Sequence, residues 1–352
     1  MHDTAIRLVR DLPVFERQVH LRVQTRRVLC PCCGPVREAV PWLQYYARVT
    51  NRLAESVSAL CELMPIKHVA GFYHLHWHTV KTIHKRALKT RLEPQDFSGV
   101  TALLMDEFAI QKGHRYATVV VDAVRKRVLW VGRGRGRKDI RPFFQLLGAH
   151  CAEIRAVAMD MSAAYAEEVR LHCPQAEIVY DLFHVVARYG LEVVDRVRVD
   201  AANKLRHDKR ARAFVKGARW LLLRNPESIT REDERVRLQQ LLDANEDIAT
   251  VYLFKDHFKE LWSFSDERAA RAYWHELVRL VRESGIQPLI RFTNKLSAYL
   301  PGILAHCRWK LNTALVEGIN NTIKVIKRMA YGFRDDEYFF LRVRAAFPGI
   351  AR

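Results

Sequence analysis

Long apolar runs are missing from this 352-residue sequence, because charged residues interrupt every apolar stretch before the roughly 18 residues that a membrane-spanning helix needs. Residues 1–15, MHDTAIRLVRDLPVF, also lack the uncharged apolar core of a signal peptide. Acidic residues are fewer than basic ones: the sequence contains 39 Asp and Glu and 58 Lys and Arg, and the formal net charge is +19. A surplus of this size favours an anionic partner. We therefore expect a cytoplasmic protein that binds nucleic acid and no membrane.

Cysteines are few, odd in number and mostly scattered, which argues against a disulfide framework and for a reducing compartment. Only the segment CPCCG clusters them. Cys30 and Cys33 have the spacing of half a zinc site, but a closed structural zinc site needs four ligands and no second pair lies nearby. Free thiols in a remnant of a zinc-binding region are the alternative to a zinc site.

The chain has no internal repeat or long low-complexity tract, yet its pattern changes along its length. Residues 7–29 alternate apolar and polar side chains as short strands do. Residues 41–92 have helical spacing, residues 100–181 alternate strands with helices, and residues 183–300 are almost continuously helical and charged. The length and these changes predict two or three folding units.

The first helical block resembles a helix-turn-helix. Apolar residues recur at helical spacing up to Pro65, and the segment IKHVAGFYHLHWHTVKTIHKRAL then contains a break, with the small residue Ala70 where two helices cross. The second helix is expected to present a polar and basic face to the DNA major groove. That face consists of His76, His78, Thr79, Lys81, Thr82 and Lys85.

Two features of this helical block bear on alternatives to a DNA-binding motif. His74 stands where the turn glycine is usual, so two ordinary packed helices are the alternative to a DNA-binding motif. The four histidines within residues 74–84 do not predict a metal site, because helical spacing spreads them around the axis.

The next stretch predicts an α/β core. The runs VTALLMDEFAI, HRYATVVVDA and KRVLWVG indicate an antiparallel meander, and helix, strand, helix and strand follow, giving the order βββαβαβ. A strand-helix-strand unit implies parallel pairing, so the first strand can neighbour the fourth. Both of these strands end in acid, at Asp106 and Asp160. Because two carboxylates at adjacent strand ends repel one another, they predict a divalent metal site, and Mg²⁺ prefers such oxygen ligands.

A third carboxylate comes from far along the chain, in WKLNTALVEGINNTIKVIKRMAYGFRD. Glu317 heads a helical face that continues through Lys324, Lys327 and Arg328, which predicts a metal ligand beside a phosphate track. A solvated amphipathic helix, in which the acid only balances charge, is the alternative.

The segments MDEFAIQKGHRYATVVVD, VAMDMSAAY and EGINNTIKVIKRMAYGF, in this order, resemble bacterial insertion-sequence transposases of the ISL3 family. The resemblance implies a ribonuclease-H-like mixed-sheet catalytic core, interrupted by a large α-helical insertion and preceded by an all-α helix-turn-helix domain. It also implies that Asp106, Asp160 and Glu317 are the catalytic triad. The string YDLFHVV matches the family's Asp-x-x-His signature, which makes Asp181 and His184 accessory residues.

The resemblance sets the expected domain limits. These are residues 1–40 for a short cysteine-containing segment, 41–95 for the helix-turn-helix domain, 98–184 for the first part of the core, 185–305 for the insertion and 306–345 for the helix that carries the Glu. Family members carry two cysteine pairs ahead of the helix-turn-helix, of which Cys30 and Cys33 match one.

The expected insertion contains a basic stretch between Lys204 and Arg224 that favours contact with the DNA backbone, although a solvated helix face fits the same residues. Its central residues are Lys209, Arg210, Arg212 and Lys216. Among the tryptophans of this region, Trp220, Trp262 and Trp274, one could stack on an unpaired base, but core packing is the ordinary role of each. The loop GRGRGRKD fits either a flexible phosphate clamp or a solvated turn.

The reaction expected from three carboxylates that hold two Mg²⁺ or Mn²⁺ ions is phosphodiester cleavage followed by strand transfer. The sequence contains no Ser-His or Cys-His arrangement for nucleophilic catalysis. We thus expect a nucleoid-associated bacterial enzyme, assembled as a homodimer or larger oligomer on transposon terminal inverted repeats and target DNA. A DNA-binding regulator derived from a transposase, and a structure-specific nuclease with the same core, are the alternatives.

Overall fold

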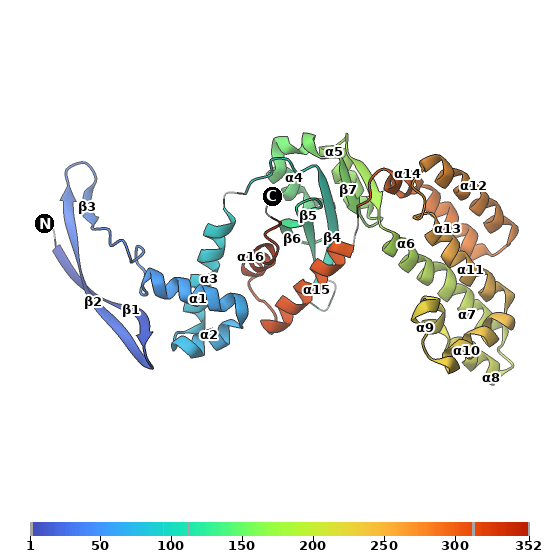
Figure 1. Cartoon of the computed structure of the whole chain (residues 1–352), viewed down its shortest axis with the longest axis horizontal. Coiled ribbons are helices and arrows are strands. Elements are labelled where there is room, and N and C mark those ends of the chain that lie inside the picture. Colours follow the sequence, from blue (N-terminus) through green and yellow to red (C-terminus); the bar gives the residue numbers. More distant parts are fainter. Residues whose placement is uncertain (1–2, 94, 112, 114, 312–313, 351–352) are drawn as a thin grey trace. The chain divides into compact units, whose positions relative to one another are not determined.

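The computed structural model describes residues 3–93, 95–111, 113, 115–311 and 314–350. The chain forms two compact units, which are considered separately below (Figure 1). The first unit contains Met1–Asp96 and Ile319–Pro348, and the second contains Phe97–Gly318 and Gly349–Arg352. Two segments that are far apart in the sequence therefore form the first unit.

The first unit begins with an antiparallel three-stranded sheet in the order β1-β2-β3. Its strands are β1 (Asp3–Val14), β2 (Arg17–Cys30) and β3 (Gly34–Arg37). They are longer than the short strands predicted, because β1 and β2 pair from Asp3–Arg27 to Val14–Arg17 with one irregularity near the turn. The sheet is tied to the following helices where Asp11 accepts hydrogen bonds from Thr50 and Arg52.

Three helices follow, α1 (Asn51–Leu63), α2 (Ile66–Tyr73) and α3 (Trp77–Leu92). The helical pattern predicted from residue 41 holds only from Asn51, where Thr50 caps α1 by accepting from the Leu53 amide. Between α2 and α3, His74 adopts a left-handed conformation (φ 51°) that usually favours glycine, and it ends α2 as a turn residue. The helix-turn-helix geometry therefore forms despite the missing glycine.

Helix α16 (Asp336–Ala346) comes from the end of the chain and packs against α3 within the first unit, together with buried Leu88, Tyr338 and Leu341. His84 is fully buried at this contact: its Nδ1 lies 2.7 Å from the Tyr338 hydroxyl and its Nε2 lies 3.2 Å from Glu62. Burial lowers the pKa of His84, so we infer that the neutral ring accepts from Tyr338 and donates to Glu62.

The second unit is built on a five-stranded mixed sheet in the order β6-β5-β4-β7-β8. Its strands are β4 (Ala102–Gln111), β5 (Arg115–Asp122), β6 (Arg127–Arg133), β7 (Ala156–Met159) and β8 (Glu177–Tyr180). The first three pair antiparallel, while β4–β7 and β7–β8 pair parallel. The predicted order βββαβαβ is confirmed, as is the pairing of its first strand with its fourth.

Helices α4 (Arg137–Leu147) and α5 (Ala163–His172) provide the two helical segments of that order. Phe143 and Phe144 of α4 are buried in one cluster with Met105 and Met159 from the sheet. Glu168 of α5 is fully buried but accepts hydrogen bonds from Arg137 and Arg141 of α4, which fixes α5 against α4. Two residues of the loop region GRGRGRKD are also tied down, since Arg137 pairs with Glu168 and Arg135 with Glu107.

Residues 182–304 are mainly helical, as the pattern predicted. The helices are α6 (Leu182–Tyr189), α7 (Asp195–Lys204), α8 (Lys209–Lys216), α9 (Arg219–Leu223), α10 (Glu232–Asp243), α11 (Glu246–Glu260), α12 (Glu267–Glu283), α13 (Gln287–Ser297) and α14 (Leu300–Leu304). Helix α15 (Ala314–Met329) follows and continues from the second unit into the first. The domain limits expected from the sequence remain a prediction.

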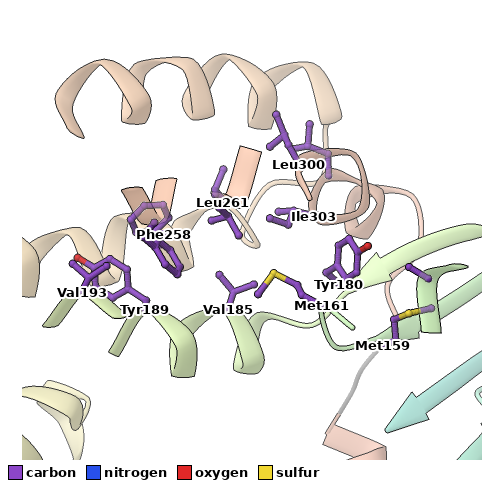
Figure 2. Packing of buried hydrophobic residues seen from close by; sticks show 14 of the residues in the cluster. Met159, Met161, Tyr180, Val185, Tyr189, Val193, Phe258, Leu261, Leu300 and Ile303 are labelled. Atoms are coloured by element: carbon purple, nitrogen blue, oxygen red, sulfur yellow. The ribbon is translucent and has the colours of Figure 1, made fainter. Parts of the chain in front are cut away.

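One apolar core joins the sheet to these helices. Figure 2 shows Met159 and Tyr180 from the sheet at one end of the cluster, and Tyr189 and Phe258 at the other, with Ile303 among the residues that bridge them. The helices therefore share their core with the sheet and do not form a separately packed body.

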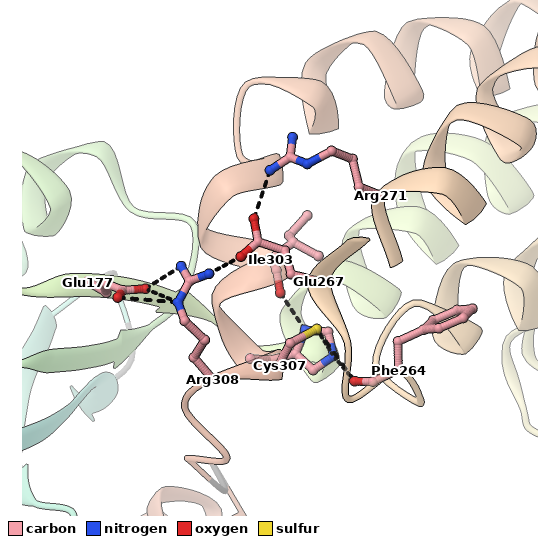
Figure 3. Close-up of polar contacts among 8 residues, drawn as sticks. Glu177, Phe264, Glu267, Arg271, Ile303, Cys307 and Arg308 are labelled. Atoms are coloured by element: carbon pink, nitrogen blue, oxygen red, sulfur yellow. Dashed lines mark hydrogen bonds and ion pairs between the residues drawn. The ribbon is translucent and has the colours of Figure 1, made fainter. Parts of the chain in front are cut away.

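A surface ion cluster reinforces this attachment (Figure 3). Arg308 donates from Nε to Glu177 of β8 (3.0 Å) and also pairs with Glu267 of α12. Glu267 in turn accepts from Arg271 at 2.8 Å. One guanidinium thus links the edge strand of the sheet to the helices. Within the described residues, no helix is both long and apolar enough to cross a lipid bilayer.

Replacing Asp335 tests the attachment of α16. This residue caps α16 by accepting from the Tyr338 amide and pairs with Lys81 and Lys85. We expect Asp335→Ala to lower the free energy of unfolding by about 1–2 kcal/mol, because both the cap and the ion pairs are lost. Asp335→Asn should cost less, because asparagine also caps helices well. Equal losses of stability in the two variants, measured by thermal unfolding at neutral pH, would contradict this division between the helix cap and the ion pairs.

The same carboxyl predicts a pH dependence. Burial of Asp335 opposes its ionisation, but the Tyr338 amide and the Lys85 and Lys81 ammonium groups outweigh burial and lower the pKa to about 2. Since the pKa is lower in the folded state, the stabilisation is complete above the ordinary value of 3.8 and is lost as the pH falls towards 2. The difference in stability between the protein and Asp335→Asn should therefore shrink in acid unfolding measurements over this range.

Candidate active site

The register of the mixed sheet relates two carboxylates on its neighbouring strands β4 and β7. The parallel strands β4 and β7 pair Leu104 with Ala158. Asp106 and Asp160 each follow two residues later, so the same register places them side by side and on the same face. The role of these two acids at a metal site remains a prediction.

Asp160 is poorly compensated by its protein neighbours. Its Oδ1 atom is buried and has no hydrogen-bond partner in the described structure. Burial raises the pKa of Asp160, and the Glu107 carboxylate raises it further, against the opposing effects of His184 and Arg188. A buried carboxylate oxygen without a donor is costly, and a bound cation is one group that removes the cost.

A third acid lies on the next strand. Asp181 directly follows β8, whose Tyr180 pairs with Met159 in parallel register, so Asp181 lies beside Asp160. Asp181 caps α6: its Oδ1 accepts from the Phe183 amide at 3.1 Å. Its Oδ2 accepts from His184 Nδ1 at 3.0 Å.

His184 is electrostatically part of the same site. The hydrogen bond to Asp181 raises the pKa of His184 despite partial burial, and the charges of Asp106 and Asp160 raise it further. Asp160 and Asp181 directly follow β7 and β8, and His184 lies in the first turn of α6. Asp106, however, lies within β4 and pairs with Val119, so the prediction that its strand ends there is wrong. The donor set of these four residues is rich in hard oxygens, which fits a divalent cation such as Mg²⁺.

Glu107 is a neighbour of the site to which the sequence analysis gave no role. Its carboxylate accepts from Arg135 at 2.9 Å, and that guanidinium lies 4.3 Å from the centre of the Tyr116 ring. Glu107 also raises the pKa values of Asp160 and Tyr165. The sequence MDEF places Glu107 directly after Asp106, which could have indicated that Glu107 lies near the site. Only the fold shows that an arginine neutralises it.

Glu317 lies in the first turn of α15 and is exposed. Residues 312–313, which precede this helix, lie outside the described residues. Within the described part of the chain Glu317 makes no hydrogen bond or ion pair, and no contact joins it to Asp106 or Asp160. Its place in the triad remains a prediction. On the same helix Lys324 and Arg328 are exposed, while Lys327 is half-buried.

The predicted basic stretch of the insertion is largely exposed. Lys209, Arg210 and Lys216 of α8 are open to solvent, and Arg212 is half-buried. The three tryptophans differ: Trp274 is buried, Trp262 is partly buried and stacks on His306, and Trp220 is 68% exposed. The Arg219 guanidinium lies 5.2 Å from the Trp220 ring centre. Only Trp220 could therefore stack on a base without rearrangement.

The predicted recognition face is divided in the structure. On α3, His78 and Thr82 are exposed and Thr79 is half-buried. Lys81 and Lys85, however, point to α16, where Asp335 accepts from both at 3.0–3.1 Å. Their charges are compensated within the protein, which the local sequence pattern did not indicate. Contact of these two lysines with DNA remains a prediction that would require breaking the pairs.

Cysteines at the end of the first sheet form a second candidate metal site. The sulfur atoms of Cys30, Cys32 and Cys33 lie within 4.8 Å of one another, and this is the only such group of metal-ligating side chains among the described residues. Hydrogen bonding, first from Cys32, lowers the pKa of Cys30 to about 6. The spacing in the sequence predicts only Cys30 and Cys33 as ligands. Three thiol ligands suit a soft cation such as Zn²⁺, which takes a fourth ligand.

Comparison with known proteins agrees with this geometry. A family model described as transposase matches residues 103–343, which include nearly all of the mixed sheet and the helices inserted after it. The chain belongs to the ISL3 family of transposases. Two more models match, the helix-turn-helix domain of transposase family ISL3 over residues 38–88 and the zinc-finger of transposase IS204/IS1001/IS1096/IS1165 over residues 1–33.

Similar proteins carry the same description. The chain is 53% identical to the transposase for insertion sequence element IS1001 of Bordetella parapertussis, covering 100% of this chain and 87% of that protein. It is 28% identical to the transposase for IS1557 of Mycobacterium tuberculosis strain H37Rv, covering 91% of this chain and 77% of that protein. ISL3 membership gives the chain the function of an insertion-sequence transposase that binds DNA through its helix-turn-helix. The family also implies use of a divalent metal.

Replacing Asp160 by Asn separates stability from activity. We expect Asp160→Asn to raise the free energy of unfolding by about 1 kcal/mol, because it removes a charge whose buried oxygen lacks a donor. Because burial raises the pKa of Asp160 in the folded state, this difference should shrink as the pH falls and the wild-type carboxyl takes up a proton.

Added Mg²⁺ or Mn²⁺ should raise the thermal midpoint of the wild type and leave that of Asp160→Asn unchanged. Glu232→Gln, at a well-exposed acid of α10, serves as the control and should behave as the wild type in both measurements. A metal-induced shift of equal size in Asp160→Asn would contradict a metal site at this carboxylate.

Proposed function

We propose that the chain cuts DNA at transposon ends and joins the ends to target DNA, using Asp106, Asp160 and Glu317 as metal-binding catalytic residues. The observation that carries this proposal is the register of β4 and β7, which aligns Asp106 with Asp160 and leaves a buried Asp160 oxygen without a protein donor. The mixed-sheet order of the second unit agrees with a ribonuclease-H-like core, which is part of the same proposal.

Asp106 and Asp160 would hold Mg²⁺ or Mn²⁺, with Glu317 completing the ligand set from α15. Two such ions, when bound, activate a water or a DNA 3′-hydroxyl and stabilise the leaving oxygen of the phosphodiester. The protein residues mainly position the DNA and neutralise charge, so no side chain has to serve as the nucleophile. This fits a site whose titratable groups are almost all carboxylates.

Asp181 and His184 would act as positioning residues. The Asp181 carboxylate fixes the ring of His184 through Nδ1 and leaves Nε2 directed away from that hydrogen bond. Because the surrounding carboxylates raise the pKa of His184, the ring holds a proton more readily than a free histidine. A protonated ring beside Asp106 and Asp160 would offset their charge and donate to a phosphate oxygen.

DNA would be held by surfaces in both units. In the first unit we propose contacts from His78, Thr79 and Thr82 of α3. Along the part of α15 that belongs to the first unit we propose phosphate contacts from Lys324, Lys327 and Arg328. In the second unit we propose phosphate contacts from α8, at Lys209, Arg210, Arg212 and Lys216. The partners are terminal inverted repeats and target DNA, and the assembly on DNA is a homodimer or larger oligomer.

Zinc is a separate proposal for the first sheet. Cys30, Cys32 and Cys33 would supply three thiolate ligands, and the lowered pKa of Cys30 favours the thiolate form that binds metal. The match of residues 1–33 to a transposase zinc-finger supports this assignment. A structural role follows from the position of the cluster at the turn between β2 and β3.

The triad is tested by single and combined substitutions. We expect Asp106→Ala, Asp160→Ala and Glu317→Ala each to abolish Mg²⁺-dependent cleavage of DNA that carries the element's own ends, while salt-sensitive DNA binding persists. The triple variant should be barely worse than a single one, because residues that act as a unit are not additive. The measurement is strand cleavage and strand transfer on labelled ends, with Glu232→Ala as the control.

Each outcome of that assay has a definite meaning. Full activity of Glu317→Ala would remove it from the triad. Cleavage without joining by the wild type would identify a structure-specific nuclease, and end binding without cleavage would identify a DNA-binding regulator.

The role of α8 is tested by charge removal. Replacing Lys209, Arg210 and Lys216 together by Gln removes three candidate phosphate contacts, each of which contributes about 0.9 to the slope of log affinity against log salt. We expect a slope shallower by about 2–3 units and weaker end cleavage. The matched control replaces Arg271, Arg279 and Lys295, which are paired with acids on the same unit, and should leave the slope unchanged. An unchanged slope in the α8 variant would show that this face is only solvated.

A further inference from the structure

Helix α3 has two basic edges with different surroundings. Along one edge Lys81, Lys85 and Lys89 face α16, where Lys85 lies 2.7 Å from Glu337 and Lys89 also pairs with Glu337. With Asp335, two acids thus compensate three ammonium groups. This edge already has a partner inside the protein.

The neighbouring edge of α3 is open. His78, Thr82, Arg86 and Thr90 follow one another at intervals of four residues and are all exposed. Thr82 donates to the His78 carbonyl at 2.8 Å, which leaves its hydroxyl oxygen able to accept. Arg86 makes no hydrogen bond or ion pair within the part of the chain that the structure describes. It is therefore a guanidinium available for a phosphate or a guanine.

A groove of about 850 Å³ runs between this open edge and the turn formed by residues 44–48, with α1 along its other side. His78, Thr82 and Arg86 line it from α3, and Tyr45, Tyr46 and Arg48 line it from the turn. Glu55 of α1 also lines the groove, which disfavours a phosphate on the α1 side. Anionic backbone is accordingly expected along α3 and the turn.

The turn is preformed. Tyr45 and Tyr46 are 62% and 68% exposed, and their rings meet edge to face at 4.3 Å. The Arg37 guanidinium lies 5.9 and 5.2 Å from their ring centres. Tyr46 has φ 59°, a left-handed conformation that is unfavourable in a residue with a bulky side chain. The protein therefore maintains a strained turn that displays two rings to solvent beside the open edge of α3.

We propose that duplex DNA is bound by a composite surface, the open edge of α3 together with the Tyr45–Tyr46 turn, and not by the edge that faces α16. Arg86 and Arg48 contact phosphate or guanine, His78 and Thr82 contact base edges in the major groove, and the tyrosine pair packs against the adjoining sugar-phosphate backbone. This proposal rests on end binding by the helix-turn-helix and adds the residues that perform it. The family match over residues 38–88 includes both parts of the surface.

Comparison of Arg86→Ala with Lys85→Ala tests the choice of edge, using the full-length protein and labelled duplex from the element's ends across a range of salt concentrations. For Arg86→Ala we expect about tenfold weaker binding at physiological salt and a salt slope shallower by about 0.9. Arg86→Lys should restore most of the slope. Lys85→Ala should keep the wild-type slope, because the Lys85 charge is neutralised by Asp335 and Glu337.

The turn is tested by Tyr45→Ser combined with Tyr46→Asn, since asparagine tolerates the left-handed conformation. We expect weaker binding to end DNA with the salt slope retained, because the rings contribute apolar contact and no charge. Lys89→Ala, on the α16 edge, is the matched control. Circular dichroism and thermal midpoints close to those of the wild type show that each variant is folded.

Two results would overturn the proposal. One is a loss of slope in Lys85→Ala with none in Arg86→Ala, which would assign DNA to the α16 edge. The other is unchanged binding by both Arg86→Ala and the tyrosine double variant. Neither result affects the proposed catalytic function, which fails separately if the wild type does not cut end DNA with Mg²⁺.

Discussion

The parallel pairing of β4 with β7 is the constraint on which the candidate active site depends. It sets the register that aligns Asp106 with Asp160, and the parallel pairing of β7 with β8 then places Asp181 beside Asp160. Folding free energy from the buried apolar faces of these strands holds carboxylates closer together than they would stay in solution. Carboxylates held together in this way raise the free energy of the protein unless a cation or a proton compensates their charge.

The strands that carry or precede Asp106 and Asp160 could be predicted from the sequence, because apolar alternation and the order of elements are local properties, although Asp106 lies within its strand and not at its end. The alternation in MDEF and VAMDM locates Asp106 and Asp160, and the rule of right-handed crossovers makes their strands neighbours. Asp181 and His184 were found only through a motif resemblance, and the structure explains it, since a helix cap and its third following residue must lie together. Glu317 illustrates the limit, because no local pattern fixes how a distant helix approaches a sheet.

The recognition helix shows why other features escaped prediction. Lys81 and Lys85 have the spacing of a phosphate-binding face, but their partner Asp335 lies about 250 residues later in the sequence. Periodicity within a helix shows which residues share a side and gives no information on what covers that side. The missing turn glycine was also a poor guide, because His74 adopts the left-handed conformation without it. The spacing of the cysteines favoured Cys30 and Cys33 as metal ligands, whereas the turn also brings the sulfur of Cys32 close to theirs.

The first unit combines two segments that are far apart in the sequence, which affects how the protein is made. Helix α16 supplies the partners of α3, and its residues leave the ribosome about 250 positions after those of α3. At a synthesis rate of about 5–20 residues per second, this interval is on the order of ten seconds or more. Until then, His84 and Leu88 lack the surface that buries them. A nascent or prematurely terminated chain consequently lacks the helix that buries this side of α3.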